Sequence, residues 1–264
     1  MAKQDGSMVQ SVERALSLLW RLAEHPEEKA GLAELAAHLD VDKSSAFRLL
    51  STLIKYDLVR QDEGVRGYRL GYGIYRLAAS LREQLKITEA CSPILKRLAL
   101  ATKENAHLAV LSGTKAVFID RERAAKSIAA NTNIGDTEEL YCTAVGRCLV
   151  CAHAEEELEA LLGGIEMTRF TERTIVEPAR LREELRAIRA RGYALDDGEY
   201  EPNVVCLAAP VYGFEGKVEA SIGISGPRER MEAEMELYRA AVLAAGGEAS
   251  SLLGGSARPR PAQA

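Results

Sequence analysis

The sequence predicts an α+β protein with two folded parts, on three observations. The first 70 residues contain three short helical patterns followed by two strand-like runs. Residues 71–102 then keep a helical apolar stripe, and the rest of the chain mixes strand-like and helix-like segments. The 264 residues, 47% hydrophobic and 28% charged, suffice for two ordinary globular domains. We therefore expect a small N-terminal domain, a helical linker and a larger C-terminal domain.

The first helix is expected after a polar tail at residues 1–8. Apolar residues from Val12 to Ala23 recur at helical spacing. Ser11 is the expected N-cap, and His25-Pro26 is the expected stop, because proline cannot continue a helix.

Two further helices and a hairpin complete the N-terminal part. Leu32 to Leu39 predicts a second, shorter helix, and a turn at residues 40–42 leads to a third helix over residues 43–56. Residues 58–60 and 68–70 read as two strands joined by a charged, glycine-containing turn. This order is that of a winged helix-turn-helix domain, which we assign to residues 9–70.

The third helix has the pattern of a DNA-reading helix. Its apolar residues fall on one side of a helical wheel, whereas small hydroxyl residues and arginine fall on the other. Arginine can contact guanine with two hydrogen bonds, and hydroxyls reach phosphates. The free amides at the helix start also favour a phosphate. An ordinary solvated helix face is the alternative for any single helix, but the adjoining wing favours DNA. The expected contacts are Lys43, Ser44, Ser45, Phe47, Arg48 and Ser51 on the helix and Arg66 and Arg69 on the wing.

Net charge alone argues against nucleic-acid binding, because the chain carries −5. Between Lys43 and Leu70, however, six basic residues stand against three acidic ones. This local excess matters more for phosphate contact than the total does. We expect modest affinity per monomer and reliance on paired half-sites.

The remainder reads as a linker helix at residues 71–87, an α/β domain at residues 88–253 and a disordered tail at residues 254–264. Helical patterns also cover 93–102, 144–152, 155–162 and 178–191, with a final helix over 229–253. Strand-like runs cover 107–111, 116–120, 204–211 and 218–225.

One strand of this domain has the pattern of a pocket wall. From Val218 to Ser225, apolar residues alternate with small polar ones that include Ser221 and Ser225. Solvent-facing serines on a half-buried sheet are the alternative. The helix entered through Tyr141 would offer its free amides from Ala144 to Gly146, which suit a carboxylate. An organic acid is therefore a reasonable ligand.

The sequence resembles the IclR family of bacterial transcriptional regulators from about Ser11 to Leu253. The resemblance rests on eight motifs in order: SVERAL at 11–16, LAELA at 32–36, KSSAFRLLSTL at 43–53, YRLG at 68–71, TAVGRCL at 143–149, GYALDDGE at 192–199, CLAAPV at 206–211 and ISGP at 224–227. It implies a GAF-like C-terminal domain that binds small effectors, often organic or aromatic acids. The matching pocket positions are Ala144, Val145, Asp196, Val204, Cys206 and Ser225.

Gly223 departs from that pattern, because some members have a serine there. The change removes a hydroxyl and should leave room, which favours a bulkier effector. A surface-turn role for Asp196 is the alternative to a ligand contact.

An enzyme is the main alternative reading. Cys148 and Cys151 form a CxxC with His153 nearby, but no second CxxC completes a zinc site, and core-facing thiols are the better account. No GxSxG, GxGxxG or Walker motif is present. We therefore expect neither catalysis nor a cofactor or metal. A protein-interaction module is a third reading.

The expected partners are double-stranded DNA with a near-palindromic operator, an organic-acid effector and a second copy of the chain, as a dimer or dimer of dimers. No apolar run approaches the roughly 18 residues that span a bilayer, and the start lacks a secretory signal. We expect a cytoplasmic protein without a membrane partner.

Overall fold

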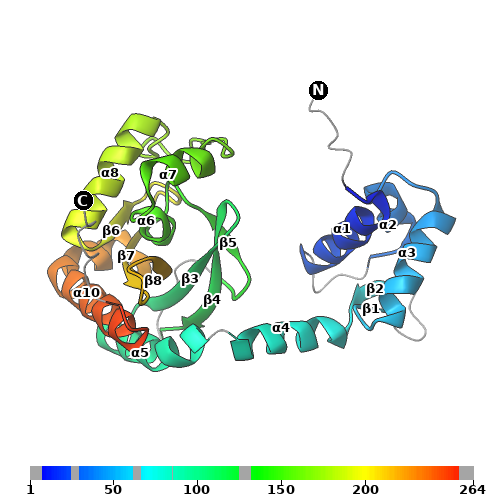
Figure 1. Ribbon diagram of the computed structural model, residues 1–264, viewed down its shortest axis with the longest axis horizontal. Helices are drawn as coiled ribbons and strands as arrows, with labels where there is room; N and C mark the ends of the chain where they lie inside the picture. Colours follow the sequence, from blue (N-terminus) through cyan, green and yellow to red (C-terminus); the bar gives the residue numbers. More distant parts are fainter. Residues whose placement is uncertain (1–7, 25–29, 62–66, 85, 125–131, 256–264) are drawn as a thin grey trace. The chain divides into compact units, whose positions relative to one another are not determined.

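The computed structural model describes residues 8–24, 30–61, 67–84, 86–124 and 132–255 (Figure 1). The chain divides into two compact units, Met1–Leu85 and Lys86–Ala264. Each unit has its own buried core, and each is described separately below.

The first unit contains helices and one hairpin, in the order expected for a winged helix-turn-helix. Its elements are α1 (Gln10–Glu24), α2 (Leu32–His38), α3 (Lys43–Lys55), β1 (Val59–Gln61), β2 (Tyr68–Leu70) and α4 (Tyr72–Gln84). Leu18, Leu35 and Leu50 are fully buried, and each comes from a different helix of the three-helix set. The apolar spacing of these helices therefore builds one small core.

Two expectations concern the ends of α1. One is wrong, and the other falls on residues that the structure does not describe. Ser11 is not an N-cap, because α1 begins one residue earlier, at Gln10. His25-Pro26 lies outside the described residues, and α1 ends at Glu24 just before it.

The second unit is a six-stranded antiparallel sheet with helices around it. Its elements are α5 (Lys86–Thr102), β3 (Asn105–Ser112), β4 (Lys115–Glu122), β5 (Thr137–Glu139), α6 (Ala144–Val150), α7 (Glu155–Leu162), α8 (Pro178–Arg191), β6 (Ala194–Asp197), β7 (Val204–Tyr212), β8 (Val218–Pro227), α9 (Arg228–Ala233) and α10 (Met235–Leu252). The strand order is β5-β4-β3-β8-β7-β6.

The helix boundaries differ from expectation in two places. The helix expected from Pro93 begins at Lys86, so Pro93 lies inside α5 although proline removes one backbone hydrogen bond. The single final helix is interrupted at Glu234, which separates α9 from α10. The short strands β5 and β6 were not expected from the sequence, because three or four residues give too little alternation to recognise.

The sheet curves, and its two faces are covered by different helices. Figure 1 shows α6 inside the curve and α10 with α5 outside it. A Cβ on Gly246 of α10 would lie 2.6 Å from the Cβ of Ala209, so the outer helix packs directly against the sheet. All seven residues of α6 are buried. The inner face of the sheet therefore packs against α6.

Candidate DNA-binding surface and effector site

The start of α3 is capped by Asp42, which sequence reasoning did not single out. Its carboxylate accepts the Ser45 amide at 2.9 Å and the Ser45 hydroxyl at 2.7 Å, and it also accepts the Ser44 hydroxyl. These hydrogen bonds hold the pKa of Asp42 well below its usual range. One of the amides expected to be free at this helix start, that of Ser45, therefore already donates to a carboxylate. The hydroxyls of Ser44 and Ser45 donate to the same carboxylate.

The outward face of α3 presents the expected polar side chains. Ala46 and Leu50 are fully buried, whereas Arg48 and Ser51 are exposed. Phe47 is 51% exposed, which leaves its ring available to a partner. Ser51 donates to the Phe47 carbonyl at 2.8 Å, so its hydroxyl oxygen remains an acceptor. Among the other expected contacts, Lys43 and Ser44 are exposed and Ser45 is half-buried.

The wing brings two arginines together. β1 and β2 pair so that Arg60 stands directly opposite Arg69. The Arg60 guanidinium also lies 4.7 Å from the ring centroid of Tyr72, the first residue of α4. Arg69 is half-buried, and Arg66 lies outside the described residues. Arg60 is thus a basic residue of the wing that the sequence-based contact set omitted.

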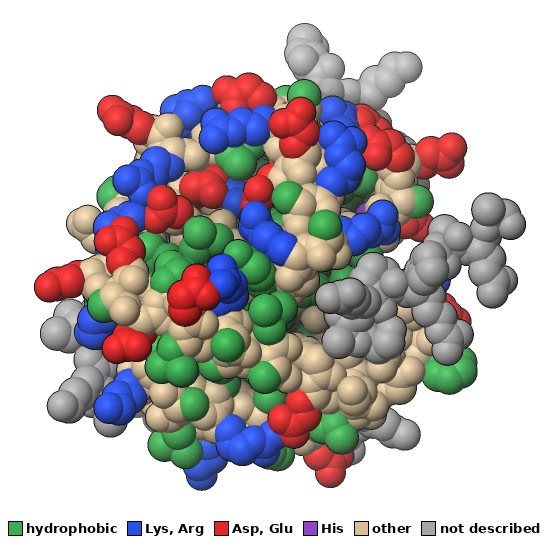
Figure 2. All heavy atoms as spheres, turned by 90° about the vertical axis from the view of Figure 1, so that its left-hand side faces the viewer, with side chains coloured by type: hydrophobic (Ala, Val, Ile, Leu, Met, Phe, Trp, Pro, Cys, Tyr) green, Lys and Arg blue, Asp and Glu red, His purple; other side chains and the backbone are tan. Residues whose placement is uncertain are grey.

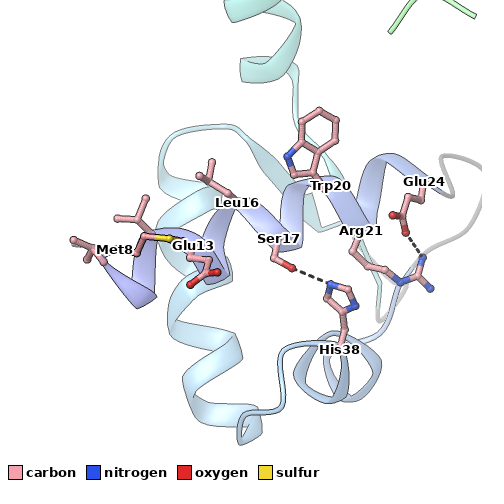
Figure 3. A pocket seen from close by; sticks show the side chains of 10 residues that line it. Met8, Glu13, Leu16, Ser17, Trp20, Arg21, Glu24 and His38 are labelled. Atoms are coloured by element: carbon pink, nitrogen blue, oxygen red, sulfur yellow. Dashed lines mark hydrogen bonds and ion pairs between the residues drawn. The ribbon is translucent and has the colours of Figure 1, made fainter. Parts of the chain in front are cut away.

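An exposed apolar face runs along α1 (Figure 3). Val12, Leu16 and Trp20 are 55%, 52% and 72% exposed. They line a groove of about 590 Å³ whose polar edge includes the Ser17 to His38 hydrogen bond at 3.0 Å. Such spacing on one helix face normally marks a surface that is covered in an assembly.

The inner face of the second unit aligns three of the expected effector residues. Asp196, Cys206 and Ser225 stand directly opposite one another on β6, β7 and β8. Directly opposed residues share one face of a sheet. Val204 lies two residues before Cys206 on the same face and is half-buried, as is Cys206. The three motifs that carry these residues therefore meet in space.

The serines of β8 are buried, so the solvent-facing alternative is wrong. Ser221 is fully buried, and Ser225 is 4% exposed. The Ser225 hydroxyl forms a 2.7 Å hydrogen bond with Nε2 of His107 on β3. Burial lowers the pKa of His107 to about 4, so the imidazole is neutral. Sequence reasoning missed His107, because the pairing of β3 with β8 joins residues 118 positions apart.

Gly223 does not leave spare room at its own Cβ position. An added Cβ would lie 2.5 Å from the carbonyl oxygen of Leu207 and 2.9 Å from the Cβ of Ala208. The expectation of room for a bulkier effector at this point is therefore wrong. Neighbouring strand β7 fills the space that a side chain would need.

Asp196 is buried rather than part of a surface turn. It is 2% exposed, and its Oδ1 accepts the Glu199 amide at 2.7 Å. Burial raises the pKa of Asp196 to about 7 despite that hydrogen bond. Burial also raises the pKa of Glu138, on β5, to about 8, and the negative charges of Asp196 and Glu201 act in the same direction. Sequence reasoning missed Glu138.

A buried ion pair fixes the turn that holds Asp196. Arg147 of α6 is 1% exposed and forms an ion pair with Glu199. Its Nε also donates to the Tyr141 carbonyl at 2.8 Å and its Nη1 to the Leu195 carbonyl at 3.2 Å. The ion pair therefore joins the TAVGRCL motif to the GYALDDGE motif.

At the start of α6, the amides of the first two residues have no partner within the helix. The Thr143 hydroxyl accepts the Gly146 amide at 3.1 Å, which leaves the amides of Ala144 and Val145. All three residues are buried. Tyr141 is fully buried, and its hydroxyl donates to the Thr168 carbonyl at 2.8 Å. Tyr141 therefore supports the site rather than offering a free hydroxyl.

The cysteines lack the surroundings of nucleophiles. All five are free thiols, and burial raises the pKa of Cys151 to about 11 and that of Cys148 well above its usual value. Catalytic thiols have lowered pKa values instead. Within the described ranges, no three His, Cys, Asp or Glu residues are grouped so that they could hold a metal ion.

The outer surface of the second unit carries charges of both signs. Figure 2 shows Lys and Arg side chains interspersed with Asp and Glu around a group of hydrophobic side chains. This face offers no continuous basic surface for a phosphate backbone. Among the described helices, none has the length and hydropathy of a membrane span.

Comparison with known proteins identifies both units. Residues 11–63 match the IclR helix-turn-helix domain, and residues 79–251 match the C-terminal domain of the bacterial transcriptional regulator IclR. The HTH-type transcriptional regulator BhcR of Paracoccus denitrificans is 32% identical over 95% of this chain and 89% of its own. The HTH-type transcriptional repressor AllR of Escherichia coli is 28% identical over 84% and 82% of the two chains.

The fold agrees with solved structures along nearly the whole chain. The crystal structure of the Thermotoga maritima IclR has a TM-score of 0.76 and 26% identity, covering 92% of this chain and 98% of its own. A transcriptional regulator from Rhodococcus sp. RHA1 has a TM-score of 0.80 and 27% identity, covering 93% and 98%. With the winged helix-turn-helix first and the sheet domain second, the chain belongs to the IclR family of DNA-binding transcriptional regulators.

Proposed function

We propose that this protein controls a catabolic operon by binding its operator through α3 and the wing. The polar side of α3 enters the major groove, where Arg48 reads a base edge and Lys43 and Ser51 contact the strand beside it. Arg66 and Arg69 on the wing meet the flanking backbone. The exposure of Arg48 and Phe47, opposite a fully buried Leu50, supports this orientation.

A small organic or aromatic acid binds on the inner face of the second unit. Asp196, Cys206 and Ser225 supply the row of polar contacts, and the amides of Ala144 and Val145 suit a carboxylate. The burial of this row supports a small ligand rather than a macromolecule, because few atoms of it are open to solvent.

Pairs of subunits bind the two halves of a near-palindromic operator. The apolar face of α1, with Leu16 and Trp20 more than half exposed, fits a second copy of the same helix across a two-fold axis. Pairing of two subunits compensates for the small excess of basic residues between Lys43 and Leu70, because each monomer alone contacts few phosphates. BhcR and AllR are named as regulators, which supports regulation over catalysis.

The observation that carries this proposal is that the two units differ. One has an exposed polar helix face, and the other has a buried row of polar residues. Fluorescence anisotropy with DNA from upstream of the protein's own operon tests it at several salt concentrations. We expect specific binding that weakens steeply with salt. Salt-independent binding, or equal affinity for unrelated DNA, would contradict the proposal.

A further inference from the structure

The wing carries an arginine, Arg60 on β1, that was not among the expected DNA contacts. Val59, the residue before it, is 1% exposed and packs in the core of the first unit. Because successive side chains of a strand point to opposite faces, Arg60 lies on the outer face of the hairpin. The register of β1 and β2 places Arg69 directly opposite Arg60, and directly opposed residues share one face. The outer face of the wing therefore carries two neighbouring arginines.

The guanidinium of Arg60 lies over an aromatic ring. Its central carbon is 4.7 Å from the ring centroid of Tyr72, which is the geometry of a cation–π contact. A ring supplies no acceptor oxygen, so this contact does not consume the N–H donors of the guanidinium. Nε of Arg60 is buried and has no hydrogen-bond partner among the described residues. Buried donors are nearly always hydrogen-bonded in native proteins, and an anion that arrives with the DNA would account for this one.

Tyr72 contributes its ring to Arg60 from outside the core. It is the first residue of α4, and its side chain is 67% exposed. A ring that is mostly open to solvent adds little to core packing. Replacement of Tyr72 should therefore change the surroundings of Arg60 with little cost to the fold.

The backbone on both sides of Tyr72 is fixed to the turn that follows α3. The Gly71 amide donates to the Leu58 carbonyl at 2.9 Å, and the Gly73 amide donates to the Asp57 carbonyl at 2.7 Å. A Cβ on Gly73 would lie 2.6 Å from the Asp57 carbonyl oxygen, so a residue with a side chain could not approach this closely. These contacts fix the position of Tyr72 relative to the end of α3.

A second cation lies beside an aromatic ring at the end of α3. Lys55 is the last residue of that helix, and helical spacing places it on the same side as Arg48. Its Nζ lies 5.8 Å from the ring centroid of Tyr56. A Cβ on Gly73 would lie 2.8 Å from the Tyr56 carbonyl oxygen, so the backbone of this pair adjoins the first turn of α4. Basic and aromatic residues therefore continue from the polar side of α3 toward the start of α4.

We propose that Arg60 contacts a phosphate of the DNA backbone beside the wing, and that Tyr72 positions its guanidinium for this contact. The inference rests on the proposed binding of DNA and extends the binding surface to the first turn of α4. Arginine suits a phosphate because its planar group presents parallel N–H donors. The ring restricts a long side chain before DNA arrives, which lowers the entropy lost on binding. Tyr72 is a positioning residue, because it acts through Arg60.

The salt dependence of DNA binding tests the contact made by Arg60. Fluorescence anisotropy on the full chain uses DNA from upstream of the protein's own operon and an unrelated duplex of the same length. Arg60→Ala should weaken binding to both duplexes by about tenfold, because a phosphate contact carries no sequence information. The slope of log affinity against log salt should become shallower by about 0.9 for each bound subunit.

Two further variants separate the charge of Arg60 from its shape and its position. Arg60→Lys keeps the charge but loses the planar donors, so it should keep the wild-type slope and lose part of the affinity. Arg76→Ala is the matched control, because Arg76 is exposed on α4 at a distance of one helical turn from Tyr72, and it should keep both slope and affinity. An Arg60→Ala protein with the wild-type slope would overturn the phosphate contact.

Variants of Tyr72 test the positioning role. Tyr72→Phe keeps the ring and should bind DNA like the wild type, whereas Tyr72→Leu should weaken binding to both duplexes by about threefold. In a protein that already carries Arg60→Ala, Tyr72→Leu should cause no further loss, because its effect passes through Arg60. Unchanged melting temperatures show that the variants are folded. A further threefold loss in the double variant would refute the positioning role.

The same titrations distinguish failure of this inference from failure of the proposed function. If the wild type binds DNA steeply with salt and Arg48→Ala weakens operator binding, but Arg60→Ala behaves like the wild type, only this inference is wrong. If the wild type shows no salt-dependent binding to either duplex, the proposed DNA-binding function is wrong, and this inference falls with it.

Discussion

Asp42 in the first unit and Asp196 in the second occupy opposite surroundings, although each lies in a candidate site. Asp42 is exposed, accepts hydrogen bonds from Ser44 and Ser45, and has a lowered pKa. Asp196 is buried, accepts the Glu199 amide, and has its pKa raised to about 7. Water and hydroxyl groups stabilise the first charge, whereas the second is held in a place where a charge is costly.

The difference shows how the two units can be tuned for different partners. On α3, the proposed contact with a large, charged partner is shared among several exposed side chains, and solvent screens each of them. Beneath α6, few groups are available, so the protonation of one carboxyl changes what the site can bind. Substitutions in the second unit should therefore affect stability and chemistry together, whereas those on α3 should affect affinity with little effect on folding.

The largest expected effect is the loss of the buried ion pair of the second unit. Arg147→Ala leaves Glu199 buried without its partner, which should lower the free energy of unfolding by about 3–5 kcal/mol. Arg21→Ala in the first unit breaks the more exposed pair with Glu34 and should cost about 0–1 kcal/mol. Urea unfolding of both variants measures the contrast. Equal losses would contradict the distinction between buried and exposed charge.

Loss of Arg48, which we propose reads a base edge, should come next. Arg48→Ala should weaken specific operator binding by about 1–3 kcal/mol, roughly five- to 150-fold, with an unchanged melting temperature. Arg76→Ala on α4 removes a positive charge that is also exposed but lies outside α3, and serves as the control. Anisotropy titrations at one salt concentration compare the two variants. An Arg48→Ala protein that binds like the control would remove Arg48 from the reading surface.

The buried carboxyls of Glu138 and Asp196 should make the stability of the second unit depend on pH. The folded-state pKa of Glu138 is about 8 against 4.5 for the free side chain, and that of Asp196 is about 7 against 3.8. Their contribution is therefore fully present below about pH 4 and is lost as pH rises through 7 and 8. The melting temperature should fall by on the order of 5 °C as the pH rises from about 4 to about 8. Glu138→Gln should flatten the profile in differential scanning calorimetry, and an unaltered profile would contradict the assignment.

The smallest effect is expected at the cap of α3. Asp42→Asn keeps a capping oxygen but removes the negative charge at the helix start that we propose lies near the phosphate backbone, so DNA affinity should rise by less than about tenfold. Asp42→Ala removes the cap as well and should lower the melting temperature of the first unit. Mobility-shift and melting assays on the two variants separate charge from capping. Weaker DNA binding by Asp42→Asn would show that its carboxylate does not oppose phosphate.

The sequence predicted the exposed site more fully than the buried one, for physical reasons. The α3 surface follows from the spacing of Ala46, Leu50 and Leu53, which all proved buried. Helical periodicity is local, so a single stretch of sequence contains it. The Asp42 cap was not predicted because the turn contains two acidic residues, Asp40 and Asp42, and only the structure shows which one reaches the Ser45 amide.

The buried site depends on pairings that no local pattern contains. The row of Asp196, Cys206 and Ser225 was indicated by resemblance to a family, and strand register is what places these residues side by side. His107 joins Ser225 only through the pairing of β3 with β8. Glu138 lies on a three-residue edge strand, which is too short for an alternating pattern to show that its side chain is on the inner face.

The central claim is that a ligand on the inner face of the second unit changes the affinity of α3 for DNA. Operator affinity of the wild type and of Ser225→Ala, each with and without a saturating acid effector, tests it most directly. We expect the effector to change wild-type affinity by about five- to 150-fold, and the variant to bind operator normally but respond weakly. Unchanged wild-type affinity at saturating effector, or an equal response from Ser225→Ala, would contradict the account.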